Sequence, residues 1–169
     1  MNQYKYIIAV LVQNQFGVLN RVTSMFRRRQ FNIDTLTVSE TESPDYSRIT
    51  VRFHGDPRTK HQLVEQLYKL PVVSAVEDMQ PDDAVCRELL LIKMENNPAS
   101  RSDILAAVEA YGAKSEDYTR DSIVIQLTGD TNRIDAFINL MRDYHILEIC
   151  RTGVVALERG CKTIREEIN

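Results

Sequence analysis

The sequence lacks the features that several classes of protein require. Its three cysteines, Cys86, Cys150 and Cys161, are odd in number and show no CxxC spacing, which argues against a disulfide framework and a zinc site. No apolar run approaches the ~20 residues of a membrane-spanning helix. The residues after Met1 lack the basic start and the cleavage signal of a secretory peptide. We therefore expect a cytoplasmic protein with reduced thiols and no membrane partner.

Charge and composition exclude further classes. A net charge of -3 gives no electrostatic reason to expect a nucleic-acid partner. With 43% hydrophobic residues and only 6 glycines and 5 prolines in 169 residues, the chain does not have the composition of a disordered protein. Its length allows one domain or two small ones.

The first half of the chain shows strand and helix patterns in the order βαββαβ. Strand patterns cover residues 4–12, 33–39, 48–53 and 72–79, and helical periodicity covers residues 18–30 and a segment opened by the capping pair Asp56 and Pro57. The two middle strands read as a hairpin with one solvent-facing side, joined by an exposed, mobile loop at residues 41–45. The three arginines at 27–29 read as a solvated helix terminus.

The same order repeats in the second half, after a short polar break. Strand patterns cover residues 88–95, 113–118, 122–128 and 146–157, the last with a possible bulge at Gly153, and the helices are marked by a capping box of Ser100 with Asp103 and by the apolar set Ile134, Phe137, Ile138 and Met141. This pattern predicts an α+β fold of two consecutive ferredoxin-like βαββαβ domains. We place the domains at residues 1–79 and 85–169, with a linker at 80–84.

Catalytic machinery is missing from the pattern. The histidines, His54, His61 and His145, share no metal-binding spacing. The segment 153–163 resembles a phosphate-binding loop but has two residues too many between its glycines, and Cys161 stands before its lysine. We therefore expect no catalytic residue, no metal site and no cofactor in this chain, although acidic loops leave room for a loosely bound surface cation.

The turn between the first strand and the first helix has the pattern of a binding site. Asn14 offers a side-chain acceptor and two donors, and Gly17 has no Cβ to hold a ligand away from the backbone. The free amides that begin the helix at Val18 face this turn and suit a carboxylate. A free amino acid fits this combination, while the alternative is a turn that Gly17 merely eases and Asn14 caps.

Asn32 supports the interpretation of this turn as a binding site, provided that the protein forms a dimer. It follows the first helix, so within one βαββαβ unit it lies at the opposite end of that helix from Gly17. A two-fold dimer would bring Asn32 of one copy to the glycine turn of the other, and would form two equivalent sites.

Four stretches of the sequence carry a resemblance to a known family. They are Asn-Gln-Phe-Gly-Val-Leu-Asn-Arg-Val at 14–22, Phe-Asn-Ile at 31–33, Ser-Arg-Ile-Thr-Val at 47–51 and Arg-Thr-Gly-Val-Val-Ala-Leu-Glu-Arg-Gly at 151–160. The first three resemble the ACT domain of the small regulatory subunit of acetohydroxyacid (acetolactate) synthase, and the last resembles that family's C-terminal signature. The resemblance covers nearly the whole chain.

The resemblance implies a homodimeric, non-catalytic partner of a large subunit. That large subunit uses thiamine diphosphate, Mg²⁺ and FAD, and the small subunit raises its activity and confers feedback inhibition by valine in branched-chain amino acid biosynthesis. A stand-alone amino-acid sensor and a scaffold that binds no effector remain the alternatives.

The resemblance also assigns the effector site. It implies that Asn14 and the amides of Gly17 and Val18 bind the effector's carboxylate and amino group, with Asn32 and Ile33 supplied by the second subunit. Two positions depart from the family pattern: Phe16 replaces a small or polar residue, and Asn20 stands where serine is common. Each could reshape the pocket, so valine is the expected effector and leucine and isoleucine are alternatives, since one or two methylenes discriminate by only ~1 to 3 kcal/mol.

Overall fold

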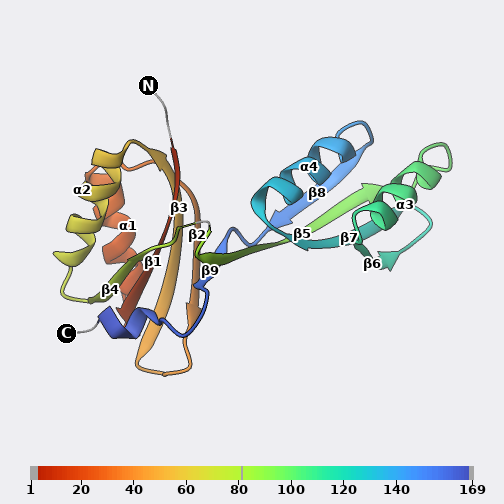
Figure 1. The fold of residues 1–169 in the computed structure, drawn as a ribbon. Helices are drawn as coiled ribbons and strands as arrows, with labels where there is room; N and C mark the ends of the chain where they lie inside the picture. The colour runs from red at the N-terminus through yellow and green to blue at the C-terminus, as the bar shows by residue number, and fades with distance from the viewer. Residues whose placement is uncertain (1–3, 81, 168–169) are drawn as a thin grey trace. The chain divides into compact units, whose positions relative to one another are not determined.

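A computed structural model describes residues 4–80 and 82–167 and contains two compact units (Figure 1). The first unit comprises the chain up to Val85 together with the residues from Val154 onward, and the second unit comprises Cys86–Gly153. The first sheet has four strands and the second has five, one of them added by the C-terminal part of the chain, and each unit carries two helices. The predicted α+β fold of two βαββαβ units is confirmed.

The first unit has strand order β2-β3-β1-β4. Its elements are β1 (Tyr4–Gln13), α1 (Val18–Arg28), β2 (Ile33–Glu40), β3 (Tyr46–Gly55), α2 (Pro57–Tyr68) and β4 (Val73–Asp78). Both helices cover one face of the sheet (Figure 1), where alternate residues of β1, such as Ile8 and Val10, pack against Val22 and Phe26 of α1 and Leu63 of α2. Because β1 is central in the sheet, the turn that follows it is fixed by pairing with both neighbours.

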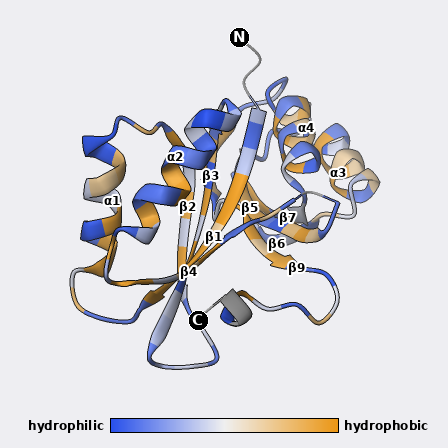
Figure 2. Ribbon diagram, turned by 60° about the vertical axis from the view of Figure 1, so that its left-hand side comes forward, coloured by the Kyte–Doolittle hydropathy of each residue, from blue (hydrophilic) through white to orange (hydrophobic). Residues whose placement is uncertain are grey.

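The second unit repeats this arrangement with strand order β6-β7-β5-β8. Its elements are β5 (Ala84–Glu95), α3 (Arg101–Ala110), β6 (Lys114–Tyr118), β7 (Ser122–Gly129), α4 (Thr131–Met141) and β8 (Ile146–Arg151). The apolar stripe predicted for its second helix is buried in full, at Ile134, Phe137, Ile138 and Met141. Hydropathy colouring shows the same logic in both units: apolar colour gathers on the strands and alternates with polar colour along the helices (Figure 2).

The last predicted strand is two strands. β8 ends at Arg151, and a separate strand, β9 (Val155–Glu158), pairs with β5. Gly153 between them has φ 79°, which ends the extended backbone instead of forming the expected bulge. The chain passes at this point from the second unit to the first, whereas the sequence placed all of 85–169 in one domain. Of the expected linker 80–84, Pro81 lies outside the described residues, and Ala84 already belongs to β5.

Residues 154–167, here called the C-terminal segment, lie on the face of the first sheet that carries no helix. The short 3-10 helix η1 (Ile164–Glu167) contacts β1 and β4. Arg48 of β3 donates from Nη2 to the Ala156 carbonyl at 2.9 Å. The predicted solvent-facing side of the β2–β3 hairpin is therefore only partly exposed: Ser39 and Glu40 of β2 are exposed, whereas Thr50 of β3 is 3% exposed. A strand's own alternation cannot show that a distant segment returns to cover it.

The starts of two helices test the capping predictions. Asp56 accepts a bond from the Thr59 amide at 2.7 Å and Pro57 is the first residue of α2, as expected. The capping box at Ser100 was wrong, because the Ser100 side chain makes no capping bond; the Asn97 carbonyl instead accepts from the Arg101 amide at 2.9 Å. Within the described ranges, no helix has the length and apolar character needed to cross a membrane.

Candidate functional site

The turn between β1 and α1 has a left-handed glycine at its end. Gly17 has φ 81° and ψ 3° and is the N-cap residue of α1. A Cβ atom added there would meet no heavy atom within 4 Å, so the turn needs glycine for its backbone angles and the space in front of it is open. The Gly17 amide donates to no acceptor within the described part of the chain.

The first turn of α1 also lacks an anion of its own. Among the described residues, no side chain caps it, and its first turn holds no acidic residue. By contrast, α2 and α4 are capped by Asp56 and Asp130, and the hydrogen bonds from Thr59 lower the pKa of Asp56. Helix N-termini favour negative charge, so α1 is the one of these three that leaves this position to a ligand.

Asn14 connects this turn to the β2–β3 hairpin. Its Nδ2 donates to the Pro44 carbonyl at 3.0 Å, and its backbone amide donates to the Asp45 carbonyl at 2.7 Å. The side chain is exposed. The side-chain amide of Asn14 thus uses one of its N–H donors within the chain. Its oxygen, Oδ1, is an acceptor and takes no part in the bonds to these two carbonyls.

Val18 contributes less than the sequence suggested. Its side chain is 6% exposed and belongs to the core, and its amide donates to the Gln15 carbonyl at 3.3 Å. The structure therefore brings Asn14, Gly17 and Val18 together, with the Gly17 amide as the most available donor. Phe16, beside them, is fully exposed.

Asn32 and Ile33 lie elsewhere in the chain, as the sequence predicted. They follow the C-terminal end of α1, and the 11 residues of this helix span about 16 Å at 1.5 Å per residue. Ile33 begins β2, which is an edge strand paired only with β3. One chain does not unite the five predicted site residues.

The second unit contains an equivalent asparagine, which sequence reasoning missed. Asn96 ends β5 as Asn14 ends β1, and its amide donates to the Asp121 carbonyl at 3.0 Å while its Nδ2 donates to the Thr119 carbonyl at 2.5 Å. Its Oδ1 accepts a bond from Arg101 Nε at 2.6 Å. An asparagine at this place in the fold therefore binds a hairpin turn and a cation together. The available signal was an asparagine just after the first strand of each repeat.

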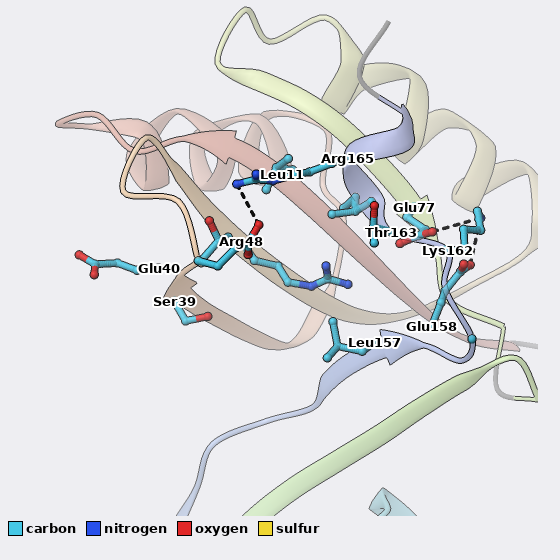
Figure 3. Close-up of a pocket in the computed structure, with 14 residues that line it drawn as sticks. Leu11, Ser39, Glu40, Arg48, Glu77, Leu157, Glu158, Lys162, Thr163 and Arg165 are labelled. Atoms are coloured by element: carbon cyan, nitrogen blue, oxygen red, sulfur yellow. Dashed lines mark hydrogen bonds and ion pairs between the residues drawn. The ribbon is translucent and has the colours of Figure 1, made fainter.

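A cavity of about 560 Å³ lies in the first unit between the sheet and the C-terminal segment (Figure 3). Lys162 Nζ lies 3.1 Å from carboxylate oxygens of both Glu77 and Glu158, and these bonds raise the pKa of Lys162 to about 12. Burial raises the pKa of Glu77 and lowers the pKa of Arg48. The charged groups of this cavity are largely paired with one another, so they hold the segment in place.

The histidines take part in pairs with carboxylates and not in a metal cluster. His54 Nδ1 lies 2.5 Å from Asp34, while His61 and His145 contact Glu65 and Glu95 at 3.3 Å on the surface. In the ranges 4–80 and 82–167, no group of three or more potential ligands could hold a metal ion.

Comparison with known proteins decides the family. A family model described as "Small subunit of acetolactate synthase" matches residues 87–160, and one described as "AHAS small subunit-like ACT domain" matches residues 8–75. The chain is 45% identical over 158 residues to the "Probable acetolactate synthase small subunit" of Archaeoglobus fulgidus, covering 94% of this chain and 99% of that protein. The chain belongs to the acetolactate synthase small-subunit family.

Further relatives of the family agree over nearly the full length. The acetolactate synthase small subunit of Bacillus subtilis is 43% identical over 157 residues, covering 92% of this chain and 91% of that protein. The crystal structure of the small subunit from Thermotoga maritima superposes with a TM-score of 0.86 at 36% identity, covering 94% of this chain and 99% of that one. The predicted family is confirmed, and the chain is a regulatory small subunit and not a catalytic one.

Proposed function

We propose that this small subunit activates the thiamine-diphosphate-dependent large subunit of acetolactate synthase and makes it sensitive to valine. The observation that supports the effector site is the start of α1, where Gly17 opens the backbone and no carboxylate of the chain occupies the helix N-terminus. A helix start of this kind binds the carboxylate of an amino acid. Asn14 Oδ1 accepts a hydrogen bond from its ammonium group, as Asn96 Oδ1 accepts one from Arg101 Nε in the second unit.

The effector site is completed by a second copy of the chain. Asn32 and Ile33 lie at the far end of α1, and β2 beside them offers an unpaired edge for two-fold pairing. In such a homodimer, each glycine turn receives Asn32 and Ile33 of the other copy. Effector binding and dimerisation are then linked, because each favours the other.

Inhibition follows from a difference in affinity between two states. Valine binds more tightly when the two ACT domains are clamped together, and this clamped dimer no longer supports the active large subunit. A coupling free energy of about 1 to 3 kcal/mol gives a several-fold to hundredfold change in effector affinity between the states. Thiamine diphosphate, Mg²⁺ and FAD belong to the large subunit, and the complex works in the cytoplasm, where the thiols of Cys86, Cys150 and Cys161 stay reduced.

The test is to mix this chain with its cognate large subunit and follow acetolactate production with and without valine, leucine or isoleucine. We expect the chain to stimulate the reaction and valine to reverse the stimulation. No stimulation would refute activation of the large subunit, and acetolactate formed by the isolated chain would refute the non-catalytic role.

Calorimetry on the isolated chain separates the effector site from a scaffold. Binding of valine at one site per chain, two per dimer, is the expected result. Stimulation of the large subunit with flat titrations for all three branched-chain amino acids would instead favour a scaffold that binds no effector.

A further inference from the structure

The β2–β3 turn, residues 41–45, is held from two sides by segments from opposite ends of the chain. On one side, Asn14 of the effector turn binds the carbonyls of Pro44 and Asp45. On the other side, Arg165 of the C-terminal segment lies 2.9 Å from Glu42 Oε1 and 5.5 Å from the ring centre of Tyr46. The same short turn therefore contacts both the proposed effector site and the C-terminal segment.

Hydrogen bonds within the turn connect its two ends. Thr41 Oγ1 donates toward the Ser43 and Tyr46 carbonyls at 3.0 and 3.1 Å, and the Ser43 amide donates back to Thr41 Oγ1 at 3.2 Å. These bonds tie the two ends of the turn to each other. These bonds form a contiguous path from Pro44, which Asn14 contacts, to Glu42, two residues earlier in the same turn.

Asn96 offers a comparison for Asn14, because its side-chain acceptor is occupied. In the second unit, the asparagine keeps its bond to the hairpin carbonyl of Thr119 while Oδ1 accepts from Arg101. Asn96 is also buried, at 4% exposed, whereas Asn14 is exposed. An ammonium group on Asn14 Oδ1 would likewise fix the rotamer of Asn14 and strengthen its hold on Pro44.

We propose that the β2–β3 turn is a positive coupling element through which an amino acid bound at Asn14 fastens the C-terminal segment to the first sheet. This inference rests on the proposed effector site and adds its route of regulation. The Arg165–Glu42 pair is partly exposed, so it contributes modestly, while the Lys162 pairs with Glu77 and Glu158 hold the segment in both states. By reciprocity, the segment raises the affinity of the site for the amino acid by the same factor.

The test measures amide hydrogen exchange at residues 159–167 of the full chain, with and without saturating valine, together with valine affinity by calorimetry. We expect valine to slow exchange in this range about two- to fivefold, the scale of an exposed ion pair. In Glu42→Gln, the slowing should disappear and the Kd for valine should rise about two- to fivefold. Glu40→Gln is the matched control, because Glu40 lines the same cavity without contacting Arg165.

A second arm needs no ligand and separates this inference from the proposed function. In the apo chain, Asn14→Ala should speed exchange at residues 159–167, and in the Glu42→Gln background it should add nothing further. Valine binding that leaves these residues unchanged, or slowing that survives in Glu42→Gln, would overturn the coupling. An absence of valine binding would overturn the effector site, and the apo arm would still show whether the turn connects Asn14 to the segment.

Discussion

Asn14 and Asn96 stand at the same place in the two units, yet their surroundings have opposite character. Both end the first strand of a βαββαβ unit, and both bind the carbonyls of the following hairpin turn. In the second unit, Arg101 fills the acceptor and the asparagine is buried. In the first unit, the asparagine is exposed and comes shortly before a glycine turn that no described side chain caps. The same local geometry therefore satisfies Asn96 within its own unit and leaves the proposed effector site open in the other unit.

The largest expected effect comes from closing the open turn. Gly17→Asp should weaken valine binding at least about a hundredfold, or about 2.7 kcal/mol, because it places a carboxylate beside the amides that bind the effector's own. In the assembled enzyme it should remove valine inhibition and leave stimulation intact. Calorimetry and acetolactate assays measure the two effects.

The control for Gly17→Asp lies in the second unit. Gly112 also has a positive φ, 57°, so Gly112→Asp introduces a comparable backbone strain away from the turn. It should leave valine affinity unchanged. If Gly17→Asp stays sensitive to valine, or if both variants lose binding alike, the assigned pocket is wrong.

The next prediction compares how much each of the two asparagines stabilises its unit. Asn96→Ala should lower the free energy of unfolding by about 2 to 4 kcal/mol, because it removes two partly buried hydrogen bonds, one of them to the charged Arg101. Asn14→Ala should lower it by less than about 1.5 kcal/mol, since water replaces the lost contact. Urea unfolding measures both, and equal losses would refute the contrast.

A smaller effect is expected from removing the guanidinium group of Arg101, which donates to Asn96 Oδ1. Arg101→Met keeps the aliphatic stem but removes the donor to Asn96, and we expect a loss of about 1 to 2 kcal/mol in the free energy of unfolding. Arg120→Met, at an exposed position of the β6–β7 turn, is the matched control and should change stability by no more than about 0.5 kcal/mol. If Arg101→Met leaves the free energy of unfolding unchanged, the hydrogen bond from Arg101 to Asn96 does not stabilise the second unit.

The smallest effect concerns pH and is specific to the first unit. Burial raises the pKa of Glu77 above its ordinary 4.5, so the folded chain binds this proton more tightly than the unfolded chain. The contribution of Glu77 to stability should therefore fall as pH rises from 4.5 through the raised pKa. In Glu77→Gln, the free energy of unfolding should depend less on pH across this window, as measured by unfolding curves at several pH values. An unchanged slope would exclude Glu77 as the titrating group.

Much of the fold could be read from local pattern. Period-2 and period-3.6 alternation located the strands and helices of both units, and Asp56 with Pro57 marked the start of α2 correctly. The clearest failure has a physical cause. Residues 154–167 were assigned to the second domain, because local pattern cannot show that a segment returns from far along the chain to the first sheet.

The candidate site divides in the same way. Asn14 and Gly17 were found from residue chemistry at short spacing, and the left-handed backbone at Gly17 agrees with that choice. The intrachain bond of the Val18 amide, the contact of Asn14 with Pro44 and the parallel with Asn96 needed coordinates. The contacts of the two asparagines depend on which carbonyls of a hairpin lie next to the end of the first strand. Short-range sequence pattern does not specify that arrangement.

The sequence by itself determined the family, the repeated βαββαβ order and the glycine turn, because these follow from short-range periodicity and from residue types at fixed spacing. Only the tertiary structure decided that Asn14 shares the β2–β3 turn with the C-terminal segment and that Asn96 is already satisfied by Arg101. Those pairings join residues far apart along the chain, and packing of the whole unit selects them.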